Sequence, residues 1–369
     1  MVYRVVIIES SSEIRKALNA LLKQSPQFKV VATYKSMLTA MGKCGIYNPS
    51  LFLIDVENLE TLSRLPILTA MFPKATTLCM MSAWNSDIAD KVIESGATGC
   101  MLKPPRSVDK ILEAINLYKG RGKPGLPYII SFFSPKGRSG RTTLAAMMAM
   151  ALATKTGEGV ALIDADLQFG DLPLFFDVEP QHTIADAVHD SKALTPMRLM
   201  PYFQKIFDNV WLLGSPERPE YAELVDSDEV IDILRMSKNL FKYILVDLPA
   251  NFNPISIAVS EFADLNFVVS MLNTGLEINH MKRCMELLNM KKLPTTKFYP
   301  ILTRVDPCND AEKLKLELKI GFPILAIFPD EYAVISMANS GQILERLTLH
   351  SDLEEIVDNL AERIIKREL

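Results

Sequence analysis

The segment that most constrains the fold is a buried strand, a short polar loop and a helix in immediate succession. An apolar run over residues 128–133 predicts the strand, and the alanine- and methionine-rich residues 144–152 predict the helix. Between them lies Ser-Pro-Lys-Gly-Arg-Ser-Gly-Arg-Thr-Thr, residues 134–143. Backbone N–H groups in such a loop converge at the positive end of the helix dipole, where they favour an anion. The pattern therefore predicts a phosphate-binding turn at the end of a strand.

Short apolar runs alternate with amphipathic stretches along the whole chain. Before residue 120 they predict strands at residues 5–8, 30–32, 51–54, 77–81 and 100–102. After residue 127 they predict strands at 160–163, 210–213, 243–246, 265–269, 298–302 and 324–327. Strands that alternate with helices are typical of parallel sheets covered on both faces. We expect an α/β protein with two doubly wound three-layer domains, whose ligands bind beyond the carboxyl ends of the strands.

A stretch rich in glycine and proline separates the two halves. Residues 120–127, Gly-Arg-Gly-Lys-Pro-Gly-Leu-Pro, show no apolar periodicity and are typical of a linker. A chain of 369 residues is long enough for two domains, each with its own core. We expect a first domain over residues 1–119, a linker over 120–127 and a second domain over 128–369.

Composition excludes several classes of function. The net charge of −4 gives no general electrostatic footprint for nucleic acid. The chain contains no apolar stretch long enough for a transmembrane segment and no N-terminal signal, which predicts a cytoplasmic protein. Five scattered cysteines without a Cys-x-x-Cys pair favour reduced thiols over disulfides or a zinc site.

In the first half, polar residues stand directly after the predicted strands. Glu9, Asp55, Ser82 and Lys103 follow the first, third, fourth and fifth strands, and Pro104 comes after Lys103. This arrangement resembles the receiver domain of two-component response regulators, which has a flavodoxin-type fold. By that resemblance Asp55 stands at the phosphate acceptor, Ser82 at the switch hydroxyl and Lys103 at the lysine beside them.

The first acidic motif departs from the receiver pattern. The family places two acids after its first strand to hold Mg²⁺, whereas Glu9 is followed by Ser10 and Ser11. Mg²⁺ prefers hard oxygen ligands, so the loss of one carboxylate should weaken metal binding and phosphotransfer. We favour a vestigial receiver that uses its fold for docking. Regulated phosphorylation of Asp55 is the alternative.

The loop in the second half resembles the deviant Walker A loop of the ParA/MinD superfamily of P-loop NTPases. By that resemblance Lys136 is the signature lysine, which reaches a partner's nucleotide across a dimer interface, and Thr142 is a ligand of Mg²⁺. The residues implied in ATP binding are Lys136, Gly137, Arg138, Ser139, Gly140, Arg141, Thr142 and Thr143, together with Pro329 farther along the chain.

Two arginines depart from the loop pattern of that superfamily. Arg141 stands where the family has lysine, and Arg138 stands where it has a second glycine. A guanidinium is planar and donates hydrogen bonds as a fork, whereas an ammonium is a compact charge. Arg138 adds a Cβ where the backbone could need glycine's freedom. We therefore expect nucleotide binding with slow hydrolysis; a turn that has lost its function is the alternative.

Further motifs follow in the superfamily's order. Asp164 and Asp166 resemble its Asp-x-Asp motif, so that Asp166 would position the attacking water and Asp164 would help to hold the metal. Asp247 ends an apolar strand as the Walker B aspartate does, and would organise Mg²⁺. Residues 328–332 and 338–341 resemble the adenine-side loop and the helix after it. Thr303 replaces the asparagine of many relatives, which argues against an adenine contact there.

A receiver-like domain ahead of a ParA/MinD-type ATPase resembles the TadZ/CpaE proteins of bacterial type IVb (Tad) pilus assembly. The resemblance covers nearly the whole chain. It implies a localisation and assembly factor with ATP and Mg²⁺ as cofactors. The ATPase half would form a homodimer, and the receiver-like half would dock other pilus assembly and secretion proteins. The expected location is the cytoplasm, with recruitment to the cell pole or the inner face of the membrane.

Two other functions remain open. A partition ATPase that binds nucleoid DNA would need a basic patch, but the lysines and arginines between residues 282 and 319 alternate with glutamates. A MinD-like membrane switch would use an amphipathic C-terminal helix. An apolar stripe is present there, at Leu353, Ile356, Val357, Leu360, Ile364 and Ile365. Its polar face mixes acids and bases, so we expect the helix to pack on its own domain.

Overall fold

A computed structural model describes most of the chain. The described residues are 2–118, 127–191, 194–272, 275–290, 297–305, 309–330 and 352–369. Residues 120–126 of the predicted linker and the helix expected near residues 338–341 lie outside these ranges. The chain divides into two compact units. The first holds Met1–Pro127 with two short later segments, Thr195–Arg198 and Arg235–Lys242, and the second holds the remainder.

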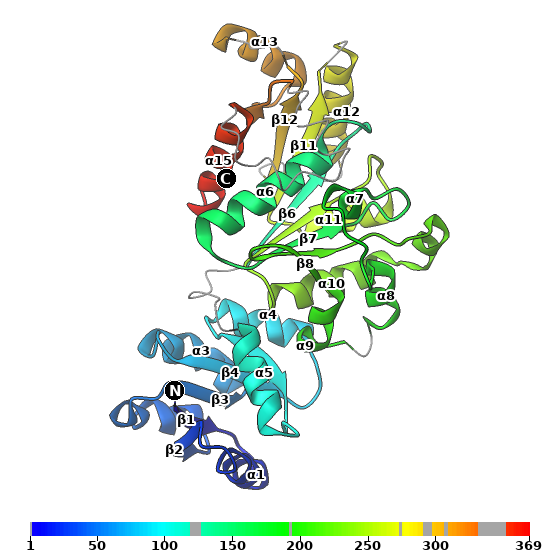
Figure 1. The fold of residues 1–369 in the computed structure, drawn as a ribbon. Helices are drawn as coiled ribbons and strands as arrows, with labels where there is room; N and C mark the ends of the chain where they lie inside the picture. The colour runs from blue at the N-terminus through cyan, green and yellow to red at the C-terminus, as the bar shows by residue number, and fades with distance from the viewer. Residues whose placement is uncertain are drawn as a thin grey trace. The chain divides into compact units, whose positions relative to one another are not determined.

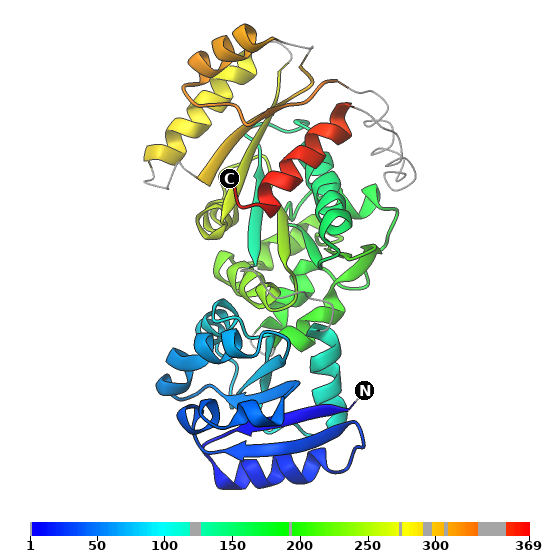
Figure 2. The ribbon, with the colours of Figure 1, turned by 90° about the vertical axis from the view of Figure 1, so that its left-hand side faces the viewer.

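The first unit is built on a five-stranded parallel sheet of order β2-β1-β3-β4-β5 (Figure 2). Its strands are β1 (Tyr3–Ile8), β2 (Phe28–Tyr34), β3 (Leu51–Asp55), β4 (Thr76–Met81) and β5 (Gly99–Leu102). Its helices are α1 (Ser12–Leu22), α2 (Met37–Met41), α3 (Leu59–Met71), α4 (Ser86–Glu94) and α5 (Val108–Tyr118), with a 3₁₀ turn, η1 (Cys44–Tyr47).

Both faces of this sheet are buried, which explains the continuous apolar runs in the sequence. In β1, Val6 and Ile8 belong to a core cluster with residues of α2, α3 and α4. Val5 and Ile7 belong to a second cluster with residues of α1 and α5. Successive side chains of a strand point to opposite faces, so β1 contributes to both cores.

The second unit is built on an eight-stranded sheet of order β13-β12-β11-β6-β10-β7-β9-β8 (Figure 1). Its strands are β6 (Tyr128–Phe133), β7 (Val160–Asp164), β8 (Gln204–Phe207), β9 (Val210–Leu213), β10 (Tyr243–Asp247), β11 (Leu265–Met271), β12 (Phe298–Thr303) and β13 (Ala326–Ile327). All neighbours are parallel except β8, which pairs antiparallel with β9 at the edge. The α/β fold class is thus confirmed. The edge strand β8 escaped prediction because its run of alternating polar and apolar residues is very short.

The helices after residue 127 vary widely in length. They are α6 (Arg141–Thr156), α7 (Leu172–Phe175), α8 (Ile184–His189), α9 (Pro196–Leu199), α10 (Ser227–Lys238), α11 (Pro254–Phe262), α12 (Leu276–Met290), α13 (Asp310–Ile320) and α15 (Asp352–Ile365), with 3₁₀ turns η3 (Met200–Tyr202) and η4 (Pro219–Leu224). Across the described ranges, no helix combines the length and the apolar character needed to span a bilayer.

Helix α6 lies inside the second unit and anchors the loop before it. Its side chains are buried on most sides, which is why its sequence lacks a polar face. Met147, Met148 and Met150 belong to the main core cluster, where flexible methionines fill irregular space. The helix ends at Gly157, whose φ of +67° is in the left-handed region that favours glycine.

The C-terminal helix α15 packs against α6 (Figure 1). Leu353, Val357, Leu360 and Ile364 are buried, and Ile356 and Ile365 are partly buried against the same core. The apolar stripe of this helix is therefore used inside its own unit, as the mixed charge of its polar face predicted. Lys155 of α6 adds ion pairs to Asp358 at 2.9 Å and Glu362 at 3.3 Å.

The stability of the second unit should depend on the central aromatic pair of the sheet. Phe267 is fully buried and meets Phe132 edge-on at 5.3 Å between ring centroids. We expect Phe267→Ala to lower the free energy of unfolding by about 3–5 kcal/mol, because a large cavity replaces the ring. Phe169 is exposed and supplies the control: Phe169→Ala should change the free energy of unfolding by less than about 0.5 kcal/mol. Urea unfolding of the two variants measures the difference.

Candidate functional site

The loop between β6 and α6 has the tight, left-handed geometry of an anion-binding turn. Gly140 caps α6 at a φ of +78°, and Arg138 also lies in the left-handed region at +62°. Upstream, the Ser134 hydroxyl donates to the carbonyl oxygen of Lys136 at 2.5 Å. The left-handed conformation costs a non-glycine residue roughly 1–2 kcal/mol of conformational free energy. The loop therefore holds Arg138 in a backbone conformation that this residue disfavours. The conformational demand inferred from the sequence at Arg138 is present in the structure.

Thr303, at the end of β12, fastens the loop from the other side. Its hydroxyl donates a hydrogen bond to the carbonyl oxygen of Ser139 at 2.7 Å, and the bond is buried. Its side chain also lies 3.8 Å from where a Cβ on Gly140 would stand. Thr303 therefore supports the loop from the end of β12.

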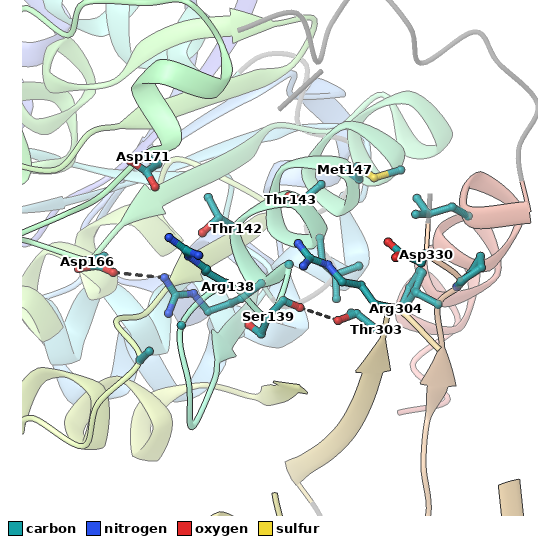
Figure 3. Close-up of a pocket in the computed structure, with 18 of the residues that line it drawn as sticks. Arg138, Ser139, Thr142, Thr143, Met147, Asp166, Asp171, Thr303, Arg304 and Asp330 are labelled. Atoms are coloured by element: carbon teal, nitrogen blue, oxygen red, sulfur yellow. Dashed lines mark hydrogen bonds and ion pairs between the residues drawn. The ribbon is translucent and has the colours of Figure 1, made fainter. Parts of the chain in front are cut away.

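A cavity of about 600 Å³ opens over the loop (Figure 3). The loop residues from Gly137 to Thr143 line it, and Asp166, Asp171, Ala250 and Arg304 lie around it. Pro329 and its neighbours Phe328 and Asp330 line it as well. This volume is in the range of small-molecule sites. The structure thus brings most of the predicted ATP-binding residues, 137–143 and Pro329, to one cavity.

Three predicted residues do not line this cavity. Lys136 is exposed beside it, whereas Asp164 and Asp247 are buried beneath it. Asp247 is reached through Thr142, whose hydroxyl donates to Asp247 Oδ2 at 2.7 Å. The roles predicted for these residues from the sequence remain predictions.

Arg141 lines the cavity and also forms ion pairs with two acids. Its Nε lies 2.5 Å from Asp247 Oδ1, and a terminal nitrogen lies 3.3 Å from Asp166 Oδ2. Burial acts to lower the pKa of this guanidinium, but the neighbouring Asp247 and Asp166 outweigh it and raise the pKa. The same charge opposes the effect of burial on Asp247, whose pKa is nevertheless raised. The sequence predicted Arg141 as a phosphate contact and did not reveal these ion pairs.

Asp164 holds the segment after β7 in place. It is fully buried; its Oδ1 accepts the backbone N–H of Asp166 at 3.2 Å and its Oδ2 accepts that of Leu172 at 3.1 Å. Burial, followed by the nearby charge of Asp247, raises the pKa of Asp164 well above its usual value. These contacts give Asp164 a structural role, because they set the position of Asp166 at the cavity.

Gly170 allows the same segment to close over Asp164, and sequence reasoning missed it. A Cβ at Gly170 would lie 2.4 Å from Asp164 Oδ2 and 2.4 Å from the hydroxyl of Ser215. Real Cβ atoms do not approach oxygen so closely, so the position requires glycine. A glycine shortly after the Asp-x-Asp pair was the available signal, but glycine is also common in loops without such a contact.

The chemistry at Thr142 and Asp247 fits a magnesium ion. A hydroxyl and a carboxylate lie side by side there, and both are hard oxygen donors. Within the described residues, no cluster of His, Cys, Asp and Glu is sufficient to hold a metal by itself. Mg²⁺ usually completes its shell with substrate phosphates and water, so two protein ligands are enough for it.

In the first unit, the predicted receiver residues meet at the carboxyl ends of β1, β3 and β5. Lys103 Nζ lies 2.7 Å from Asp55 Oδ1 and 3.4 Å from Glu9 Oε2, and all three side chains are nearly fully buried. The neighbouring Ser10 hydroxyl donates to Asp55 Oδ2 at 3.2 Å. The structure therefore brings Glu9, Asp55 and Lys103 together as the resemblance implied.

Ser82 joins this group through a residue that the sequence analysis did not select. Its backbone N–H donates to Glu57 Oε1 at 2.6 Å, and Glu57 Oε2 lies 2.9 Å from Lys103 Nζ. Burial acts to lower the pKa of Lys103, but Asp55 and Glu57 outweigh it and raise the pKa. Glu57 stands two residues after Asp55 in a loop, where an acid by itself carries no signal.

Comparison with known proteins assigns the second half of the chain. The model of the CobQ/CobB/MinD/ParA nucleotide binding domain matches residues 130–344. The chain belongs to this family. The septum site-determining protein MinD of Thermotoga maritima is 27% identical over 243 residues, which cover 64% of this chain and 87% of that protein. The expected ParA/MinD superfamily is thereby confirmed.

Solved structures of the family share the fold. A ParA family ATPase from Chlorobium tepidum aligns with a TM-score of 0.59 and 24% identity over 64% of this chain and 98% of that one. MinD from Pyrococcus horikoshii, solved as a complex with Mg-ADP, aligns with a TM-score of 0.55 and 22% identity over 66% of this chain and 97% of that one. At this identity the two structures establish the fold alone.

Gly170 provides a test of how the acidic segment is positioned. We expect Gly170→Ala to lower the free energy of unfolding by about 1–3 kcal/mol, because the new methyl group collides with Asp164 and Ser215. Gly137→Ala is the matched control, since a Cβ there meets nothing within 4 Å. Thermal melting of both variants measures the effect. Equal melting temperatures would contradict the close approach at Gly170.

Proposed function

We propose that this chain is an ATP-binding, dimerising localisation and assembly factor of a bacterial Tad pilus secretion machine, with slow ATP hydrolysis. The observation that carries the proposal is the cavity of about 600 Å³ over the loop of a CobQ/CobB/MinD/ParA domain, joined in one chain to a receiver-like unit. The domain order is the feature that points to TadZ/CpaE-like proteins rather than to single-domain relatives.

In this proposal the loop amides from Gly137 to Thr143 bind the phosphates of ATP, and Pro329 lies on the side of the base. Thr142 and Asp247 would hold Mg²⁺, which neutralises phosphate charge when bound. Asp166 would orient water at the γ-phosphate. Its pairing with Arg141 restrains that carboxylate, and the arginine replaces the compact ammonium of related loops. Both features favour slow turnover.

Dimer formation would use Lys136. This lysine is exposed and does not line the cavity beside it, although the next residues do. Such a placement supports a contact with the nucleotide of a second copy of the chain. Two copies would then enclose two nucleotides between them.

The receiver-like unit would act by docking other pilus assembly proteins, in the cytoplasm near the cell pole or the inner face of the membrane. A single acid after β1 supports docking over phosphotransfer, because Mg²⁺ would have one carboxylate fewer there. A MinD-like positioning ATPase is the second candidate, since MinD of Thermotoga maritima matches 64% of the chain. The burial of the α15 stripe against α6 disfavours membrane binding by that helix.

ATP turnover and dimer mass test the proposed site together. We expect Arg141→Lys to raise turnover by about tenfold, equivalent to a barrier lower by about 1.4 kcal/mol, because the ammonium releases Asp166 and approaches the phosphates as a compact charge. We expect Lys136→Ala to weaken the ATP-dependent dimer by about tenfold or more, since one charged contact is lost. Phosphate release and light scattering are the measurements.

Lys205→Ala is the control for charge, because Lys205 is an exposed lysine of the same unit that pairs with Asp208. It should leave dimerisation unchanged. A wild-type chain that does not bind ATP at millimolar concentration would contradict the proposal as a whole. Flotation with liposomes and retention on DNA, each with and without ATP, distinguish the pilus proposal from the MinD-like and partition alternatives.

The receiver-like unit should not accept phosphate. Incubation of the wild-type chain with acetyl phosphate and Mg²⁺ should give no one-phosphate mass shift, because one of the two expected metal-binding acids is missing. Intact-mass spectrometry measures the outcome. A shift in the wild type that disappears in Asp55→Ala would contradict this expectation and show a working receiver.

A further inference from the structure

Glu57 connects Lys103, which pairs with Asp55, to the backbone of Ser82 at the end of β4. One of its carboxylate oxygens accepts the backbone N–H of Ser82 at 2.6 Å, and the other lies 2.9 Å from Lys103 Nζ. The backbone N–H of Glu57 donates in turn to Asp55 Oδ1 at 3.1 Å. Glu57 is thus fixed to Asp55 through its main chain and to β4 and β5 through its side chain.

We propose that the carboxylate of Glu57 takes the place of a phosphoryl group on Asp55, so that the receiver-like unit is held in one state that phosphodonors do not change. This inference rests on the receiver-like role proposed for the first unit. It does not depend on nucleotide binding by the second unit.

The donors available around Asp55 support this substitution. A phosphoryl group adds nearly two negative charges and three strong acceptor oxygens, and it needs ammonium or N–H donors in reach. Lys103 Nζ lies 2.7 Å from Asp55 Oδ1, and the Ser82 amide stands at the end of the neighbouring strand β4. Glu57 already accepts hydrogen bonds from both of these donors. It supplies the negative charge and the acceptor oxygens without any modification.

The charge balance of the cluster opposes a real phosphoryl group. Glu9, Asp55 and Glu57 share the single ammonium of Lys103. Burial acts to raise the pKa of Glu57, but hydrogen bonds from Lys103 and Ser82 outweigh it and hold the pKa below its usual value, so the side chain stays ionised at neutral pH. A dianion on Asp55 would have to displace Glu57 and overcome repulsion from Glu9.

Hydrogen exchange of the full-length chain tests the proposal through the Ser82 amide. We expect Glu57→Ala to speed exchange in the peptide that covers the end of β4 by about tenfold or more, because a hydrogen bond to a charged group is lost. Glu60→Ala is the matched control: Glu60 is also a half-exposed glutamate with one ion pair, to Arg64. Glu60→Ala should leave the exchange rate of that peptide unchanged. Addition of acetyl phosphate and Mg²⁺ to the wild-type chain should also leave it unchanged.

Two results would overturn the proposal. One is a hydrogen-exchange rate around Ser82 that is the same in Glu57→Ala as in the wild type, which would show that Glu57 does not protect the Ser82 amide. The other is altered exchange of the same peptide in the wild-type chain after addition of acetyl phosphate and Mg²⁺. Hydrogen exchange in peptides of α1 reports whether the first unit is folded in Glu57→Ala. If that variant is unfolded, Glu57→Gln gives a second test, because it keeps the shape of the side chain and removes its charge. ATP binding measured on the same samples shows separately whether the proposed function fails.

Discussion

The ion pair between Arg141 and Asp247 is the interaction on which the candidate nucleotide site depends. It joins the first residue of α6 to the last residue of β10, and both side chains are buried. Without the guanidinium, Asp247 and the fully buried Asp164 would be neighbouring acids with no cation at the centre of the unit. An unpaired buried charge is far costlier than a paired one. The arginine therefore stabilises the acids that it contacts, Asp247 and Asp166.

A similar arrangement occurs in the first unit on an unrelated sheet. There Lys103 stands among Glu9, Asp55 and Glu57, again at the carboxyl ends of parallel strands. In both sites a basic side chain of the chain itself compensates a group of neighbouring acids. In each site the pairing of opposite charges stabilises the acids in the folded protein.

Sequence reasoning was most successful where neighbouring residues decide the structure. Apolar runs located the strands of both sheets except the short edge strand β8, and the loop between β6 and α6 was recognised from its glycines and threonines. It was least successful where a contact depends on distant segments. Gly170 and Glu57 gave no distinctive local signal, because the reason for each is a side chain or amide of another segment. The hydrogen bonds from Asp164 to the backbone after β7 were likewise not foreseen, and its role in holding a metal stays a prediction.

The chain's own order of residues determined its fold class, its family and the position of the loop between β6 and α6, since strand periodicity, helix starts and loop glycines act over a few residues. The pairing of charges came from the fold. Arg141 meets Asp247 from 106 positions away, and Thr303 reaches Ser139 across 164. These meetings follow from the strand order β12-β11-β6-β10-β7, which places the carboxyl ends of separate strands at one edge. The spacing of residues along the chain does not reveal the order of the strands in the sheet. The partner of a buried charge is therefore known only from the tertiary structure.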